Sequence, residues 1–349
     1  MNTKQLLLLT AKEILAKKTL KPEDLFVGVN SEKDLKRVYI KLSFKWHPDH
    51  NKEDTNDVFS HINVLYQNAK NKFSSNTWNK GLFQNFIRKD GNLYQYSFIQ
   101  EFSFELGKYY LAKESIAWVF EKDFLDLAEN ALKKINNLKY ADENMRNEMK
   151  KFIPEITQSF ITKEDKAVII FKRDCDSIML CDVLNKLDKV GPKHVAWILS
   201  NCYNLACFMQ YNKIMHGGFS LDNISINPQN HSCQLLGGWW FTHIQKEPLK
   251  ALSSKTLSVA PFEMINSKKA TFSFDLECIR FIGRSLLGDK NGLHLTKDKD
   301  IPVALVQWLR NASKNDAFNE YALWQKVLTD SFGVRRFTKM ELNSNDVYN

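Results

Sequence analysis

Apolar residues recur at helical spacing in two neighbouring segments near the start of the chain. Along the first segment they lie three or four residues apart, at Leu35, Val38, Tyr39, Leu42 and Trp46. The second segment repeats this spacing at Phe59, Ile62, Tyr66, Ala69 and Phe73. Such a period marks one face of an amphipathic helix, and Pro48, which lies between the segments, cannot continue a helix. The pattern predicts two antiparallel helices joined by an exposed loop that contains His47, Pro48 and Asp49.

The first of these helices carries a basic stripe on its polar side. Its members are Lys33, Lys36, Arg37, Lys41 and Lys45. A run of lysine and arginine on a helix is usually a solvated face. Here the stripe leads directly to the His-Pro-Asp loop, and if it steers docking, the partner surface would be acidic.

Residues 5–73 resemble a J-domain, the module of DnaJ-type co-chaperones. The matching residues are 31–39 for the helix before the loop, 46–52 around the loop, and 59–63 with Tyr66 for the helix after it. The resemblance implies that the loop and the basic stripe bind a DnaK-type heat-shock chaperone and stimulate its ATP hydrolysis. They would act by biasing the conformational equilibrium of the partner, so no catalytic residue is expected in this module.

From about residue 95 the apolar pattern changes from the helical period to alternation. Alternating residues between 96 and 120 predict three successive strands, and a helical segment at 124–135 follows. An apolar run at 167–171 predicts another strand before a helix-rich remainder that begins near Asp182. The predicted fold class is therefore α+β. A strand-rich lobe with one helix, followed by a helical lobe, is the order of the protein-kinase fold, which residues 95–338 resemble.

One segment of the helical lobe is similar to the catalytic loop of kinase-like phosphotransferases. His216 and Asn223 match the histidine and the metal-binding asparagine of that loop, whereas Gly218 stands at the position of its catalytic aspartate. With that aspartate replaced, His216 is expected to be a core histidine that braces the loop rather than a catalytic residue. Asn223 is expected to cap the loop, and the alternative is that it helps a metal or nucleotide bind.

Two further stretches extend this resemblance. Gly237 and Gly238 follow a strand predicted for residues 233–236 and stand where the family has its magnesium-binding aspartate. Asp275 resembles the aspartate that begins the long buried helix of the helical lobe. The adjacent Trp239 and Trp240 are compatible with either a recognition patch or the core.

The replacements determine the functional prediction for this part. Phosphoryl transfer needs carboxylates that hold magnesium, a lysine on the phosphates and an acid that positions the nucleophile. Glycine provides none of these, and the strand predicted at residues 116–120 carries no lysine. The resemblance therefore implies a pseudokinase, used to hold a protein client, and we expect no enzymatic activity, no cofactor and no bound metal.

Composition changes this picture little. The chain has 349 residues, a length that suggests two or three domains. Its residues are 44% hydrophobic and 12% aromatic, which indicates folded structure, and its formal net charge is +9. The basic residues are scattered among acidic ones, so the charge does not favour nucleic acid as a partner. The six cysteines include no Cys-x-x-Cys pair, and a structural zinc site is not expected. The apolar run of residues 6–9 is too short for a signal sequence or a membrane span, which favours a reducing cytoplasm.

The predicted organisation has five parts. They are a J-domain at residues 1–73, a polar connecting segment at 74–94, a kinase-like N-lobe at 95–172, a C-lobe at 173–338 and a disordered tail at 339–349. The predicted function is a co-chaperone that brings a DnaK-type chaperone to whatever the kinase-like part holds, and such fusions resemble proteins of bacterial and bacteriophage genomes. Two alternatives stay open, an atypical kinase or nucleotide-binding regulator and a nucleic-acid-associated factor.

Overall fold

A computed structural model describes residues 10–16, 22–26, 29, 31–50, 55–74, 78, 82–334 and 336–348. The chain divides into two compact units, Met1–Leu82 and Phe83–Asn349. The first unit is helical over its described residues, except that strand β1 begins at its last residue, and the second combines sheet with helices, which confirms the α+β class. Among the helices of these ranges, none has the length and apolar character needed to cross a membrane.

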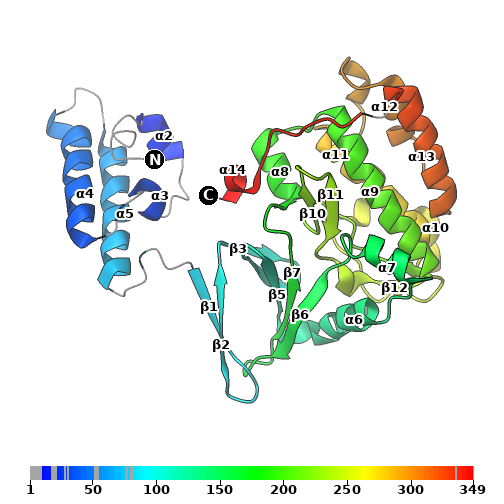
Figure 1. The fold of residues 1–349 in the computed structure, drawn as a ribbon, viewed down its shortest axis with the longest axis horizontal. Helices are drawn as coiled ribbons and strands as arrows, with labels where there is room; N and C mark the ends of the chain where they lie inside the picture. The colour runs from blue at the N-terminus through cyan, green and yellow to red at the C-terminus, as the bar shows by residue number, and fades with distance from the viewer. Residues whose placement is uncertain are drawn as a thin grey trace. The chain divides into compact units, whose positions relative to one another are not determined.

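The first unit is built around two long helices (Figure 1). Its elements are α2 (Ala11–Ala16), α3 (Pro22–Leu25), α4 (Glu32–Trp46), the 3-10 turn η1 (Pro48–His50) and α5 (Asn56–Ser74). Helix α4 begins at Glu32 because the Ser31 hydroxyl accepts the backbone N–H of Asp34 at 3.1 Å, which satisfies one of the unpaired donors of the first turn.

The buried faces of α4 and α5 form the core of this unit. Helix α4 buries Leu35, Val38 and Leu42, as the apolar pattern predicts. Helix α5 buries Val58, Ile62, Leu65 and Ala69. Ile62 and Ala69 were therefore predicted correctly, whereas Val58 and Leu65 are buried in place of the neighbouring Phe59 and Tyr66. Phe59 and Tyr66 are half-buried at the edge of the face, because their rings pack sideways against other rings rather than into the centre.

The strand-rich half of the second unit is a five-stranded antiparallel sheet. Its order is β3 (Gln100–Phe104), β4 (Gly107–Leu111), β5 (Ser115–Phe120), β7 (Ala167–Lys172) and β6 (Glu155–Ile161). In its centre Trp118 pairs with Tyr109 on one side and Ile169 on the other. The predicted helix is α6 (Leu125–Asn136), while α7 (Glu143–Met149) and β6 were not predicted.

The predicted connecting segment contains regular structure. Strands β1 (Leu82–Ile87) and β2 (Leu93–Phe98) form a hairpin, so the prediction of a polar connection over residues 74–94 was wrong for its second half. Phe86 anchors the hairpin, since its ring lies edge-on to those of Tyr110 and Phe160, each at 6.0 Å between centroids. Phe86 is a single buried aromatic residue in a polar stretch, which is too little apolar pattern to predict the hairpin from the sequence.

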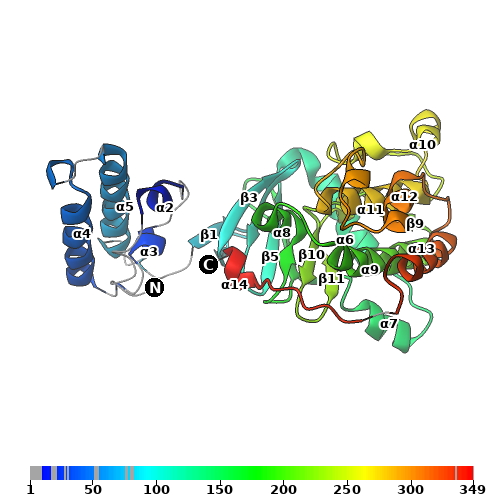
Figure 2. The ribbon, with the colours of Figure 1, turned by 90° about the horizontal axis from the view of Figure 1, so that it is seen from above.

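The helical half of the second unit surrounds two buried helices, α9 (Pro192–Tyr211) and α11 (Phe272–Leu286), and Figure 2 shows it from above. The other helices are α8 (Leu180–Leu187), α10 (Phe262–Ser267), α12 (Val303–Arg310), α13 (Ala317–Phe332) and α14 (Ser344–Tyr348). Short strands β8 (Ile178–Met179), β10 (Ile224–Asn227) and β11 (Ser232–Leu235) form one small sheet, and β9 (Ile214–Met215) pairs with β12 (His243–Ile244).

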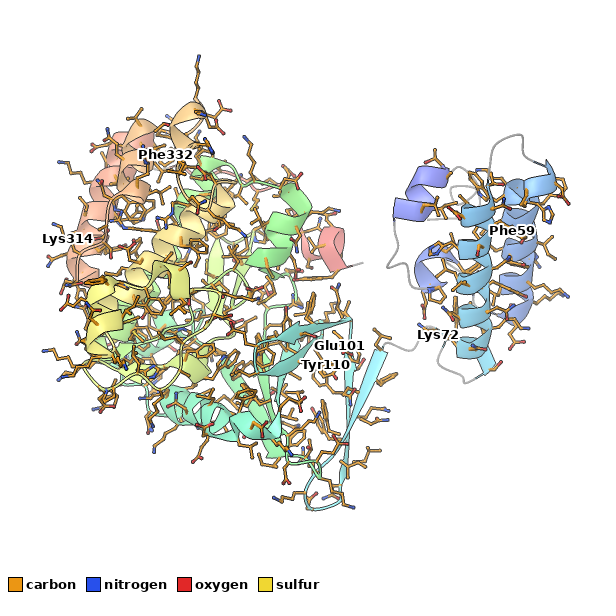
Figure 3. All side chains as sticks on the ribbon, turned by 180° about the vertical axis from the view of Figure 1, so that it is seen from behind. Phe59, Lys72, Glu101, Tyr110, Lys314 and Phe332 are labelled. Atoms are coloured by element: carbon orange, nitrogen blue, oxygen red, sulfur yellow. The ribbon has the colours of Figure 1, made fainter. Side chains whose placement is uncertain are left out.

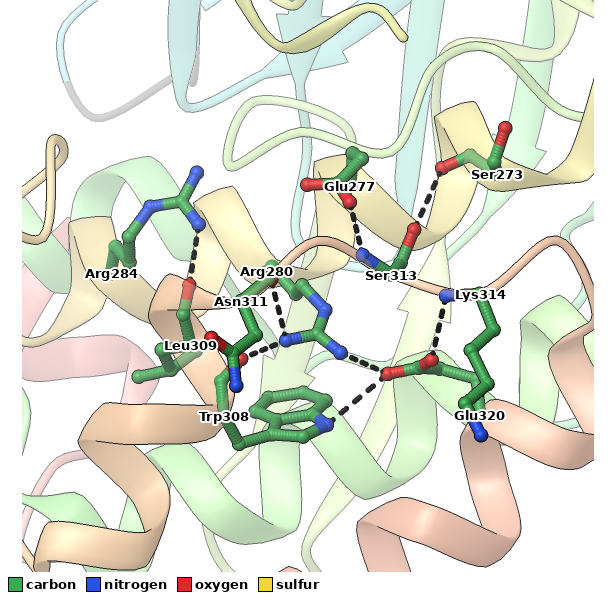
Figure 4. Close-up of polar contacts among 10 residues, drawn as sticks. All are labelled: Ser273, Glu277, Arg280, Arg284, Trp308, Leu309, Asn311, Ser313, Lys314 and Glu320. Atoms are coloured by element: carbon green, nitrogen blue, oxygen red, sulfur yellow. Dashed lines mark hydrogen bonds and ion pairs between the residues drawn. The ribbon is translucent and has the colours of Figure 1, made fainter.

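A buried ion pair joins three of these helices (Figure 4). The side chains of Arg280 and Glu320 are 1% and 0% exposed and bind each other directly. The indole N–H of Trp308 donates to Glu320 Oε1 at 3.1 Å, and the backbone N–H of Lys314 donates to Oε2 at 3.0 Å. Arg280 also donates to the carbonyl of Asn311 at 2.9 Å. Because both charges are paired and hydrogen-bonded, they fix the arrangement of α11, α12 and α13.

Residues 340–348 pack on the second unit, so the prediction of a disordered tail at residues 339–349 was wrong over this range. Met340 and Leu342 are buried, and α14 packs on α8. The hydroxyl of Tyr348 donates to Asp182 Oδ2 at 2.8 Å and accepts the N–H of Met179 at 2.9 Å. Met340, Leu342 and Tyr348 are separated by mostly polar residues, so the apolar pattern of the sequence does not reveal this packing.

Candidate functional site

The His-Pro-Asp loop is held by contacts within the first unit. The ring of His47 packs edge-on against Phe59, labelled in Figure 3, at 4.9 Å and 69°. The backbone N–H of Asp49 donates to His47 Nδ1 at 3.2 Å. The side chain of Asp49 is 81% exposed and that of His47 is 39% exposed. The loop therefore has a defined conformation and presents its carboxylate to solvent.

The basic stripe lies on the solvent side of α4. Lys33, Lys36, Arg37 and Lys41 are exposed and Lys45 is half-buried. The ammonium of Lys45 lies 4.8 Å from the centre of the Trp46 ring. The guanidinium of Arg37 is 3.4 Å from the carboxylate of Asp34, a surface pair that contributes little to stability. All eight predicted residues thus belong to α4 or to the loop that follows it.

Contacts between α4 and α5 set the geometry of this surface. The rings of Tyr39 and Tyr66 stack at 3.8 Å and 10°, and the Tyr39 hydroxyl donates to Asn63 Oδ1 at 2.7 Å. Burial, with Tyr39 beside it, raises the pKa of Tyr66. The ring stack and the hydrogen bond therefore hold α4 against α5 near Tyr39 and Tyr66.

In the second unit, Asp275 fixes the loop that contains His216. Its carboxylate accepts the backbone N–H groups of His216 at 2.7 Å and Gly217 at 2.8 Å. Burial raises the pKa of Asp275 to about 7, although both N–H groups act to lower it. The His216 ring is fully buried, accepts the N–H of Gly218 at 3.2 Å, and has its pKa lowered by burial to about 3. His216 is therefore a neutral core residue that braces the loop, as expected from the sequence.

Gly218, Gly237 and Gly238 pack against one another, and we call them the glycine cluster. A Cβ atom on Gly218 would lie 2.6 Å from the Cα of Gly238, and one on Gly237 would lie 2.4 Å from Asn223 Oδ1. Asn223 is 7% exposed and donates from Nδ2 to the carbonyl of Gly218 at 2.8 Å. The structure thus brings the five predicted positions together, in a space that a carboxylate side chain would not fit.

Aromatic side chains fill the space above the glycine cluster. Trp118 of β5 donates from its indole to the carbonyl of Leu236 at 2.9 Å. Trp240 lies 4.8 Å from Trp118, 5.1 Å from Phe120 and 5.2 Å from Phe104, between ring centroids. Trp239 and Trp240 are 0% and 2% exposed, so they belong to the core and not to a surface patch. We call Phe104, Trp118, Phe120 and Trp240 the aromatic plug.

Little room remains beside the glycine cluster. The cavity bordered by Phe104, Trp118, Trp240 and Asn223 measures about 30 Å³, roughly the volume of one water molecule. Lys255 and Asp222, whose Nζ and Oδ2 form an ion pair at 2.9 Å, also line it. Glu105 accepts the backbone N–H of Ser254 at 2.8 Å. Small-molecule sites usually need several hundred Å³, so a nucleotide would have to displace tryptophan side chains to enter here.

Sequence reasoning missed two residues of this site. Trp118 was considered only as part of a strand without lysine, and Asp275 only as the start of a helix. Their roles depend on contacts with residues far away in the chain, at Leu236 and at His216. The one local signal was the large aromatic residue Trp118 at the centre of an apolar strand, which indicates a core position.

One group of potential metal ligands occurs in the described ranges. The ligand atoms of Asp174, Cys175 and Asp176 lie within 4.8 Å of one another. The Asp174 carboxylate already accepts from Asn227 Nδ2 at 2.7 Å and from the backbone N–H of Asp176 at 3.0 Å. Burial raises the pKa of the Cys175 thiol. These features do not distinguish the group from an ordinary acidic turn.

No protein-family model matches the chain, and no curated protein matches it. The two resemblances therefore depend on the residues and geometry described above.

Proposed function

We propose that this protein is a J-domain co-chaperone that stimulates ATP hydrolysis by a DnaK-type chaperone, and that its second unit is a pseudokinase that holds a protein client. The observation that carries the proposal is the joint exposure of Asp49 in the His-Pro-Asp loop and of four residues of the basic stripe, on one helix and the turn that ends it. Neither feature contributes to the core of the first unit, which favours a role in recognition.

The two parts of this surface would act differently. Lys33, Lys36, Arg37 and Lys41 would attract an acidic face of the chaperone and raise the association rate. The loop would then bind one conformation of the chaperone better than another, which is how a ligand without catalytic groups changes the rate of a partner. Asp49, the most exposed member of the loop, is suited to make the decisive polar contact.

The second unit supports the role of a binding platform. The glycine cluster offers no carboxylate for magnesium, and the aromatic plug occupies the space above it. Phosphoryl transfer depends almost wholly on such positioned charges. A client held by this unit would meet the chaperone at high effective concentration, because both would be tethered to one chain. We place the protein in a reducing cytoplasm, in keeping with its six free cysteines.

The test uses the full chain and the ATPase rate of a DnaK-type chaperone under single-turnover conditions. We expect wild type to stimulate the rate, and His47→Gln and Asp49→Asn to abolish the stimulation. His294→Gln is the matched control, since His294 is also exposed but lies in the second unit. Urea midpoints should agree among wild type, Asp49→Asn and His294→Gln, because exposed substitutions change stability little. A cooperative urea transition for His47→Gln, whose ring packs on Phe59, would show that this variant is folded. Unchanged stimulation by both loop variants would refute the co-chaperone proposal.

A further inference from the structure

A second, larger cavity lies on the helical half of the second unit. It measures about 540 Å³ and is formed by the first turns of α9, by the turn between β10 and β11, and by the end of α13 with the segment that follows. Its lining residues are Lys193, Ala196, Trp197, Ser200, Asn201, His231, Leu328, Phe332, Gly333, Val334, Arg336 and Thr338. None of them borders the cavity at the glycine cluster. The volume falls within the usual range of roughly 300–1,000 Å³ for small-molecule sites.

Two of three stacked rings, Trp197 and His231, line this cavity, and the third, Phe337, covers the other face of His231. Trp197 stacks on His231 at 4.5 Å and 4°, and His231 stacks on Phe337 at 4.1 Å and 16°. Leu328 and Phe332, the latter labelled in Figure 3, add apolar surface from α13. A wall of parallel rings favours a flat ligand, because stacked aromatic rings attract one another in offset geometry.

The charge of the lining is of one sign. Lys193 and Arg336 border the cavity, and no aspartate or glutamate does. Within the described part of the chain, neither cation is among the residues that form an ion pair. His231 Nε2 is buried there without a hydrogen-bond partner, and burial lowers the pKa of this ring. The two cations can together bind an anionic group.

We propose that this cavity binds a small molecule that combines a planar aromatic ring with a phosphate or carboxylate group. The ring would lie against Trp197, behind which His231 is stacked, and the anion would bind Lys193 and Arg336. The site goes beyond the proposed co-chaperone function and would make the second unit responsive to a ligand. Such a ligand would bridge α9 and the segment after α13, so it should slow amide hydrogen exchange at residues 336–340.

The experiment is isothermal titration of the full chain with two pairs of probes. Adenosine monophosphate is compared with adenosine, and indole-3-acetate with indole. We expect at least one anionic probe to bind about tenfold or more tightly than its neutral counterpart, since a charge-assisted hydrogen bond contributes this much. Binding of the nucleotide alone identifies a phosphate ligand, and binding of indole-3-acetate alone identifies a carboxylate.

Variants locate the binding site. Lys193→Ala with Arg336→Ala should weaken binding about tenfold or more. The matched control, Lys297→Ala with Lys326→Ala, removes the same charge from exposed lysines outside the cavity and should leave binding unchanged. Equal urea midpoints would show that both proteins fold. The proposal is overturned if neither anionic probe binds at millimolar concentration, or if binding persists in the Lys193 and Arg336 double variant.

Discussion

A single methyl group added at Gly237 tests whether the glycine cluster is packed core or an open site. In Gly237→Ala the new Cβ would lie 2.4 Å from Asn223 Oδ1 and 2.8 Å from the Trp118 ring. Real Cβ atoms do not approach neighbours so closely, so Asn223 and Trp118 would have to move. Both are held, Asn223 by its bond to Gly218 and Trp118 by its bond to Leu236.

The expected cost follows from these contacts. Overpacking of a core by one methyl group costs roughly 1–3 kcal/mol. Displacement of Asn223 would also lose its hydrogen bond to Gly218, a net contribution of about 0.5–1.5 kcal/mol. Replacement of glycine by alanine lowers the conformational entropy of the unfolded chain, which stabilises the folded protein by about 0.4–1 kcal/mol. The free energy of unfolding should therefore fall by roughly 0.5–4 kcal/mol.

The assay is urea unfolding followed by tryptophan fluorescence. Gly191→Ala is the matched control, because its Cβ would meet only the His194 ring, at 3.7 Å, and the residue has an ordinary φ of −62°. With urea slopes of about 1–3 kcal/mol per molar, Gly237→Ala should shift the midpoint clearly and Gly191→Ala should not. Equal midpoints for Gly237→Ala and wild type would mean that the site has room for a larger side chain, contrary to our reasoning.

Three further predictions concern pH, charge and the buried ion pair. The raised pKa of Asp275, about 7, makes stability fall as pH rises from about 4 to 7, whereas the lowered pKa of His216, about 3, makes it fall as pH drops from 6.5 to 3. The effects of Asp275 and His216 on the free energy of unfolding oppose each other between about pH 4 and 6.5. In Asp275→Asn only the effect of His216 remains, so the free energy of unfolding should fall by about 1.4 kcal/mol for each pH unit of acidification. A free energy of unfolding of Asp275→Asn that does not change with pH over this range, measured in urea, would contradict this prediction. Lys41→Glu should slow association with the chaperone in low salt, whereas Lys70→Glu on α5 should not, as measured by surface plasmon resonance; equal rates would mean that the basic stripe is only solvated. Glu320→Ala should lower the free energy of unfolding by about 3–5 kcal/mol, because Arg280 would remain buried without its partner; a loss under 1 kcal/mol in urea would contradict this.

The parts of the fold with strong periodicity could be predicted from the sequence. Helix α4 has its buried residues where the apolar pattern places them, and α6 and α11 were also located. Short amphipathic elements could not be predicted, because one or two anchors determine them. Phe86 secures the hairpin of β1 and β2, and Tyr348 secures α14, each through contacts with residues distant in the chain.

In the candidate site, too, local features could be predicted from the sequence and contacts between distant residues could not. His47 and the basic stripe are local features of one helix and its following turn, so their exposure follows from the pattern alone. The positions of His216 and the glycine cluster follow from a local motif. Their packing does not, because it depends on Asp275, which lies 59 residues from His216, and on Trp118, which lies 118 residues from Leu236.

The division of roles between the two units is tested most directly by their separation. The segments Met1–Leu82 and Phe83–Asn349 are expressed individually and each is added to a DnaK-type chaperone with labelled ATP. The account predicts that the first segment stimulates ATP hydrolysis by the chaperone and loses this effect in His47→Gln, while the second neither stimulates hydrolysis nor transfers phosphate. Stimulation by the second segment alone, or phosphate transfer by it in the presence of magnesium or manganese, would contradict the account.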